Sequence, residues 1–125
     1  QLCLAPRNFR GAARLAAASP DRLHQLCRAL GVPTVIVTLG AQGCLVSESA
    51  RCTRLPAHRV KAIDTTGAGD AFAGGFAAGL VKFGGDRLAA ARFANVVAAL
   101  SVTKFGTAPS MPTAREIERF QLRAG

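Results

Sequence analysis

The sequence predicts an α/β fold, and two features of its first half carry that prediction. Residues 34–39 form an unbroken run of β-branched and aliphatic residues, TVIVTL, without the polar alternation of a half-exposed strand. Such a run is typical of a strand that is buried on both faces of a sheet with helices on each side. A helical pattern over residues 19–30, with apolar residues every three or four positions, leads directly into it. A helix that feeds a buried strand indicates an α/β protein.

The chain before this strand is predicted to form one short strand and two helices. Residues 2–4, LCL, are expected as the strand, and the Ala-rich residues 10–18 as the first helix. Ser19 is expected to cap the second helix, and Pro20 suits its first turn because proline has no N–H to leave unpaired. Gly31 is expected to end this helix.

The stretch after the buried strand is predicted to be extended and interrupted by turns. Gly40 and Gly43 bracket a turn into a second strand at residues 44–47, and a third extended piece covers residues 51–55. Residues 60–63 are expected as a further strand that leads into a glycine-rich turn.

The second half is predicted to be mainly helical. Residues 70–82 and 86–102 are expected to form two long helices that pack as a hairpin. The first of these contains three glycines, each of which costs about 1 kcal/mol in an exposed helix, and we therefore expect close packing there. They are Gly74, Gly75 and Gly79. Thr113 and Glu116 are spaced as a capping box for a last helix that carries Ile117 and Phe120.

Composition limits the class of protein. A chain of 125 residues is expected to form one domain or part of a larger one, and 50% hydrophobic residues exclude a disordered chain. The longest apolar run, residues 71–81, contains three glycines and is shorter than the roughly 20 residues that cross a bilayer. We therefore expect a soluble protein without a membrane partner. The start at Gln1 reads as a cut from a longer protein.

Cysteine and charge patterns refine this expectation. The four cysteines contain no CxxC spacing, so buried thiols and a reducing, cytoplasmic location are expected. The formal net charge of +9 raises the alternative of a basic nucleic-acid-binding module. The basic residues do not cluster, however, and there is no Tyr or Trp to stack on bases. No nucleic-acid partner is therefore expected.

The most informative stretch is the turn Gly67-Ala68-Gly69-Asp70 between a predicted strand and a predicted helix. Glycines let the backbone turn tightly there, and the amides and dipole of a helix N-terminus favour an anion such as phosphate. Asp70 would repel a phosphate, so we expect it to accept the proton of an alcohol that attacks phosphorus. The alternative is a carboxylate that only complements the helix dipole, beside glycines that only form a turn.

The longer string DTTGAGDAFAGGF, residues 64–76, resembles the second signature of the ribokinase/PfkB family of carbohydrate kinases. The resemblance implies the C-terminal part of a ribokinase-like three-layer α/β/α sandwich, with the N-terminal sugar-binding half absent. It also implies ATP-dependent phosphorylation of a sugar hydroxyl. Asp70 would be the general base and a contact of the substrate, and the amides of Gly67, Ala68 and Gly69 would form the anion hole.

The same resemblance assigns nucleotide-binding residues. The string VTLGAQG, residues 37–43, looks like the family's nucleotide-binding strand and turn, with Thr38, Gly40 and Gly43 along ATP. Asn95 sits where family members line the adenine pocket, and its amide would contact the base or ribose. The alternative for Asn95 is an ordinary helix residue that faces solvent.

Residues 101–110 resemble the monovalent-cation loop of ribokinases. By that resemblance a potassium ion would be held by five backbone carbonyls and one hydroxyl, and it would brace the anion hole from behind. The carbonyls are those of Asp64, Thr66, Ser101, Lys104 and Gly106, and the hydroxyl is that of Ser110. The alternative is an ordinary loop rich in Gly and Pro.

One departure concerns magnesium. Family members carry Asn-x-x-Glu near an early strand to organise Mg²⁺ and its waters. In this sequence Asn8 matches the Asn, but Gly11 stands three residues later, where the family has Glu. The resemblance thus implies ATP, Mg²⁺ and K⁺ as cofactors and a small sugar as the second substrate. It is also compatible with a homodimer of the full-length protein. The isolated chain is expected to be inactive. A non-catalytic, nucleotide-binding remnant of a sugar kinase is the main alternative.

Overall fold

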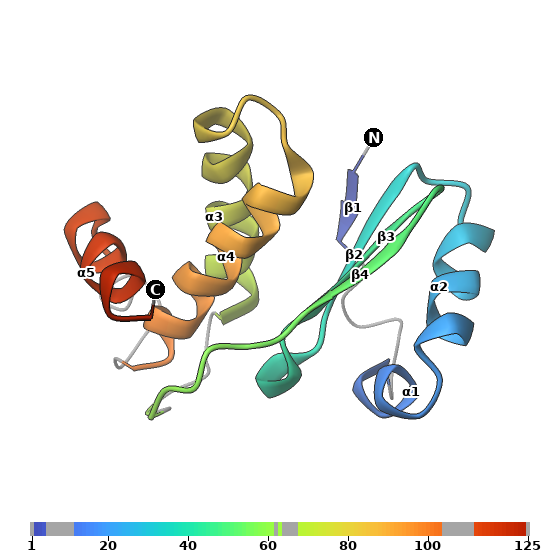
Figure 1. The fold of residues 1–125 in the computed structure, drawn as a ribbon, viewed down its shortest axis with the longest axis horizontal. Coiled ribbons are helices and arrows are strands. Elements are labelled where there is room, and N and C mark those ends of the chain that lie inside the picture. Colours follow the sequence, from blue (N-terminus) through green and yellow to red (C-terminus); the bar gives the residue numbers. More distant parts are fainter. Residues whose placement is uncertain (1, 5–11, 62, 64–67, 104–111, 125) are drawn as a thin grey trace. The chain divides into compact units, whose positions relative to one another are not determined.

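The computed structural model describes residues 2–4, 12–61, 63, 68–103 and 112–124 (Figure 1). The chain divides into two compact units, Gln1–Ala57 and His58–Gly125. Among the described residues, no helix has the length and apolar character needed to span a membrane.

The first unit is a four-stranded sheet with two helices. Its elements in chain order are β1 (Leu2–Leu4), α1 (Ala12–Ala18), α2 (Pro20–Ala29), β2 (Thr34–Thr38), the short 3-10 helix η1 (Gly40–Gln42), β3 (Cys44–Glu48) and β4 (Cys52–Leu55). The strands lie in the order β1-β2-β3-β4, with β1 parallel to β2 and the other neighbours antiparallel. The strands and helices predicted for residues 1–55 are confirmed, with ends that differ by one or two residues.

Helices α1 and α2 share one face of this sheet. Ala16 of α1 and Leu23 of α2 join Val35, Val37 and Leu45 in a single buried cluster. Val35 and Val37 are two apart on β2 and so point to the same face. Residues 34–37 are buried without interruption, which confirms the prediction of a strand covered on both faces.

A polar contact adds to this packing at the end of α2. The Arg28 guanidinium donates three hydrogen bonds, to the Ser47 hydroxyl at 3.0 Å, the Ser47 carbonyl at 2.8 Å and the Pro33 carbonyl at 3.1 Å. The His24 ring nitrogen Nδ1 lies 2.7 Å from the same hydroxyl. Because Ser47 is fully buried, these bonds satisfy a hydroxyl that would otherwise cost free energy inside the fold.

The second unit is helical and consists of α3 (Ala68–Lys82), α4 (Arg87–Ser101) and α5 (Ala114–Ala124). The predicted hairpin of α3 and α4 is confirmed, and two glycines explain how closely the helices approach. A Cβ atom on Gly75 would lie 2.9 Å from the Cβ of Val97, and one on Gly79 would lie 2.9 Å from the Cα of Ala90. No side chain fits at either position without moving a helix.

Three details of the prediction are wrong. Gly74 faces open space rather than a neighbour, so only two of the three helix glycines are needed for packing. Ser19 stands at the N-cap of α2, but its side chain makes no capping bond there, and its N–H donates to the Leu15 carbonyl of α1 at 2.7 Å. Of residues 60–63, the three that the structure describes form no strand.

The last helix begins with the predicted capping box. The Thr113 hydroxyl accepts a hydrogen bond from the Glu116 N–H at 3.2 Å, and the Glu116 carboxylate accepts one from the Thr113 N–H at 3.3 Å. This reciprocal pair fixes the residue at which α5 starts.

Candidate active site

The N-terminus of α3 presents the residues of the predicted anion hole. Ala68, Gly69 and Asp70 form the first turn of this 15-residue helix, which starts two residues earlier than predicted. The first four N–H groups of a helix have no carbonyl partner within it, and the helix dipole adds about half a positive charge there. Gly69 is exposed and has open space where a side chain would stand. Gly67 lies outside the described residues.

Asp70 is exposed in this first turn, while the next residue, Ala71, is only 1% exposed. The Asp70 carboxylate therefore lies at the surface, and the burial of Ala71 anchors the backbone beside it. This geometry suits a base that must meet a hydroxyl of a second molecule, and a first-turn carboxylate is also favourable for the helix itself.

The turn after β2 presents Thr38 and Gly40. Thr38 is the last residue of β2 and is exposed. Gly40 is also exposed, has a φ of +57° in the left-handed region, and has open space around its Cα. A ligand can therefore approach this backbone closely, which is the role that a glycine serves beside a nucleotide.

Gly43, three residues further on, is placed differently. It is buried at a φ of +90°, and a Cβ on it would collide with the backbone of the chain that leaves β4, at the Leu55 carbonyl and the Ala57 nitrogen. The Gly43 carbonyl also accepts a hydrogen bond from the Leu39 N–H at 2.8 Å. Gly43 thus shapes the turn from inside and lets a second segment pass over it.

Asn95 lies on α4 and is only 8% exposed. The alternative in which it is a solvent-facing helix residue is therefore wrong. Asn95 already has an interaction partner within the structure, so its amide would have to share or exchange that partner when it meets a nucleotide.

Of the six predicted potassium ligands, only Ser101 is described. Ser101 is the last residue of α4, it is buried, and its hydroxyl donates to the Ala98 carbonyl at 2.8 Å. The last four carbonyls of a helix lack intrahelical partners, which suits the Ser101 carbonyl to a cation. The other five, together with Asn8 and Gly11, lie outside the described residues; the five are Asp64, Thr66, Lys104, Gly106 and Ser110.

The predicted residues are divided between the two units. Thr38, Gly40 and Gly43 belong to the first unit, whereas Asp70 and Asn95 belong to the second, on the two helices of the hairpin.

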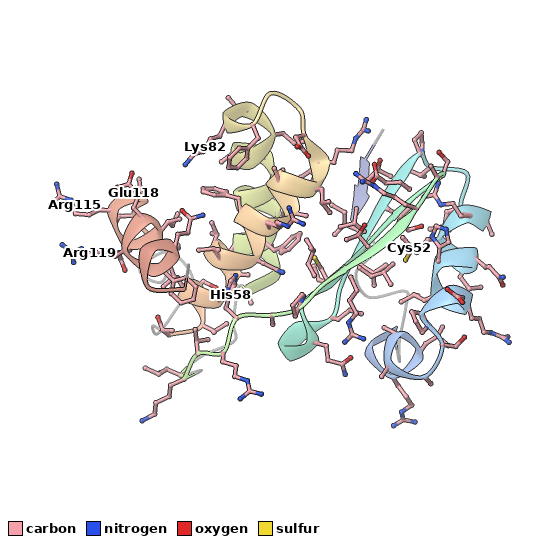
Figure 2. All side chains as sticks on the ribbon, viewed as in Figure 1. Cys52, His58, Lys82, Arg115, Glu118 and Arg119 are labelled. Carbon is pink, nitrogen blue, oxygen red and sulfur yellow. The ribbon has the colours of Figure 1, made fainter. Side chains whose placement is uncertain are left out.

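The cysteines differ from the expectation of uniformly buried thiols. Cys44 and Cys27 are buried, whereas Cys52 is exposed (labelled in Figure 2), and none of the three forms a disulfide. Cys44 pairs with Thr38 across β2 and β3. Burial raises the pKa of the Cys44 thiol to about 12, so the thiol beside the candidate nucleotide turn is neutral at physiological pH.

Sequence comparison assigns the class of protein to which this site belongs. The profile of the pfkB family of carbohydrate kinases matches residues 7–114. The chain therefore belongs to this family, as its glycine-turn motif indicated.

Curated relatives are sugar kinases. The chain is 44% identical over 91 residues to the ribokinase of Haemophilus influenzae, a match that covers 72% of this chain and 29% of the relative. It is 40% identical over 103 residues to the deoxyribokinase of Salmonella typhi, covering 80% of this chain and 33% of the relative. The chain thus spans about a third of the length of the relatives it matches.

Solved structures agree on the fold. The ribokinase of Thermotoga maritima superposes with a TM-score of 0.80 at 31% identity, covering 97% of this chain and 42% of that one. Arabidopsis thaliana ribokinase, solved with ribose and ATP, superposes with a TM-score of 0.77 at 27% identity, covering 95% of this chain and 40% of that one. A double mutant of Vibrio cholerae fructokinase, solved with fructose, ADP and a potassium ion, superposes with a TM-score of 0.76 at 30% identity, covering 95% of this chain and 40% of that one. The chain therefore has part of a ribokinase-like α/β fold.

Proposed function

We propose that residues 1–125 supply the ATP-binding and catalytic-base portion of a sugar kinase. The observation that carries this proposal is the exposed carboxylate of Asp70 in the first turn of α3. A carboxylate beside a helix end suited to phosphate is expected where an alcohol must lose a proton as it attacks phosphorus. Membership of a carbohydrate kinase family supports a sugar as this alcohol.

In the proposed reaction, a sugar hydroxyl oxygen attacks the γ-phosphorus of ATP. A new O–P bond forms, the bond from that phosphorus to the bridging oxygen of ADP breaks, and the hydroxyl proton moves to the Asp70 carboxylate. The amides of Ala68 and Gly69, with that of Gly67, donate hydrogen bonds to the transferred group. Because the helix fixes the amides of Ala68 and Gly69 before the reaction starts, these two groups would stabilise the developing charge without reorganising.

The nucleotide is proposed to lie along Thr38 and Gly40, on the turn that Gly43 shapes from within, with Asn95 towards the base or ribose. The open backbone at Gly40 supports this assignment. Mg²⁺ bound with ATP would neutralise charge on its phosphates.

A potassium ion is proposed behind the anion hole, on the residues named above from the cation-loop resemblance. The Ser101 carbonyl at the end of α4 fits such an ion, and the fructokinase neighbour contains potassium. Activity should be higher in potassium than in sodium, and Ser110→Ala should weaken that difference. Equal activity in potassium, sodium and a bulky organic cation would remove this assignment.

The sugar itself is proposed to be held by the remaining two thirds of such an enzyme, in line with the share of its relatives that this chain spans. Because phosphoryl transfer depends on holding the acceptor in place and excluding water, the isolated chain should show no sugar-dependent ADP release. A coupled assay with ribose and fructose, compared with an Asp70→Asn control, tests this expectation.

The proposal is tested by Asp70→Asn in the complete kinase that contains this segment. Turnover should fall by about 10² or more, the usual scale for a general base, while ATP binding measured by calorimetry stays within about twofold. Asp21→Asn is the matched control, because Asp21 is also an exposed carboxylate in the first turn of a helix, on α2.

The outcomes separate the proposal from its alternatives. If both substitutions leave turnover unchanged, Asp70 is only a helix-end carboxylate and the assignment of the base is lost. If the unsubstituted protein binds ATP but transfers no phosphate to any sugar, the chain belongs to a non-catalytic remnant.

A further inference from the structure

Helix α5 shares an apolar cluster with the start of the helix that carries the candidate base. Ala71, the residue after Asp70, is buried in a cluster with Val96 and Val97 of α4 and Ile117 of α5. Phe120 of α5 packs against this cluster from its edge. The residue next to Asp70 is therefore buried in the same apolar cluster as Ile117 of α5, with the residues of α4 among its members.

Phe120 also holds the segment that approaches α3 in the chain. The ring of His58 meets the ring of Phe120 edge to face, with centroids 5.2 Å apart and planes at 87°. Five residues later, the Ile63 N–H donates to the Val102 carbonyl at the end of α4, at 2.7 Å. The stretch that leads towards Asp70 is thus attached to α5 at one point and to α4 at another.

The orientation of α5 is fixed by its sequence. The capping box of Thr113 and Glu116 sets its first residue, and its opposite face carries exposed charged side chains that point away from α4 (Figure 2). These are Arg115, Glu118 and Arg119. Helix α5 begins at residue 114, where the family profile match ends, so Ile117 and Phe120 lie outside the matched residues.

We propose that Phe120 is a positioning residue for Asp70, an inference that rests on the proposed function. The first turn of a helix lacks half of its backbone hydrogen bonds, and Gly69 lowers the helical preference of this one further. The burial of Ala71 against the α4–α5 cluster is what holds this turn in place. A base must lie within hydrogen-bond distance of its hydroxyl, and a displacement of about 1 Å can cost 10²-fold in rate.

The first measurement is steady-state kinetics of Phe120→Ala in the complete kinase. We expect kcat to fall by about tenfold or more, and by a larger factor than the KM for ATP rises, because of the described nucleotide-binding candidates only Asn95 lies on a helix of this cluster. Phe120→Leu, which keeps an apolar side chain against the cluster, should restore most of kcat.

The decisive measurement combines Phe120→Ala with Asp70→Asn. If Phe120 acts through the carboxylate, its removal lowers kcat in the unsubstituted enzyme but has no further effect once the carboxylate has been replaced by an amide. A merely structural role lowers kcat by the same factor in both backgrounds. A radiometric assay can follow the slow turnover of the Asp70→Asn background.

Three controls keep this test interpretable. Arg119→Ala changes the exposed face of α5 and should leave kcat unchanged. Gly79→Ala loosens α3 at the end far from Asp70. It should lower Tm and change kcat little. If Phe120→Ala does not fold, His58→Ala removes the ring contact alone and enters the same cycle with Asp70→Asn.

Two results would overturn the positioning role and leave the proposed function intact: equal factors in both backgrounds, or a kcat for Phe120→Ala that matches the unsubstituted enzyme. A failure of the proposed function is seen separately, because Asp70→Asn alone would then leave turnover unchanged.

Discussion

The two units hold their packed helices in place by opposite means. In the first unit, α2 is held to the sheet by a long side chain, since Arg28 reaches across to donate three hydrogen bonds around the buried Ser47. In the second unit, α3 is held to α4 where side chains are missing, at Gly75 and Gly79.

The difference shows what each interface can tolerate. A contact made by hydrogen bonds is lost when one partner is removed, because the other partner stays buried and unpaired. A contact made by bare backbone is lost when any atom is added, because the backbone opposite cannot turn away as a side chain can. Truncation should therefore damage the first unit, and enlargement the second.

The largest effect is expected from Gly79→Ala. Its Cβ would stand 2.9 Å from the Cα and 3.2 Å from the carbonyl oxygen of Ala90, and overpacking of this kind costs about 2–3 kcal/mol of the free energy of unfolding. Gly74→Ala is the matched control on the same helix, because it meets no neighbour. That change should stabilise the protein by about 0.5–1 kcal/mol. Urea titrations in which the two variants shift in the same direction would break the comparison.

The next effect is expected from Arg28→Ala, at about 2 kcal/mol, because it strips the buried Ser47 of its charged donor. Arg51→Ala is the control, because Arg51 makes an exposed contact with Glu48, and such pairs contribute about 0–1 kcal/mol. Thermal unfolding curves of the two variants that coincide would show that the polar contact does not hold α2.

A third effect depends on pH. The pKa of Cys44 is about 12 in the folded chain against 9.0 as its reference value, so the folded state binds this proton more tightly than the unfolded state does. The stabilisation is fully present below pH 9 and is lost as the pH rises towards 12, at about 1.4 kcal/mol per pH unit. Cys44→Ala should flatten this decline, whereas Cys52→Ala should leave most of it. Identical pH profiles for all three proteins would contradict the assignment.

The smallest effect is expected from Thr113→Ala, which removes one half of the capping box of α5 and should cost about 1 kcal/mol. Thr113→Ser keeps the hydroxyl and serves as the control. Hydrogen exchange should show faster opening at the start of α5 in the Ala variant only. Protection that is equal in both variants would mean that packing alone holds this helix.

Local signals in the sequence predicted most of the fold. The run of buried residues in β2, the glycine that ends α2 and the capping box of α5 each depend on neighbours within a few positions, and these predictions are confirmed. What the sequence did not show is which surface faces which. It contains three glycines in the middle of α3, but only the packing reveals that Gly75 and Gly79 meet α4 and that Gly74 does not.

The candidate site divides in the same way. The motif at residues 64–76 pointed to Asp70 and to the family, because phosphate chemistry places particular residue types at a helix N-terminus. Long-range contacts were not visible in the sequence. Among them are the chain that passes over Gly43, the burial of Asn95 and the cluster that Ala71 shares with Ile117 of α5. The helical spacing of Ile117 and Phe120 signalled an apolar face, but not its partner.

The crossing at Gly43 also affects how a protease would divide the molecule. Because the backbone of residues 55–57 lies against the backbone of Gly43, these peptide bonds cannot lift away to enter a protease cleft without opening the turn. Arg59 and Lys61, a few residues further on, are exposed and belong to no helix or strand. Within the described residues that separate the sheet from α3, trypsin should therefore cut at these two positions, and a cut there would leave the whole sheet on one piece together with the segment that crosses Gly43.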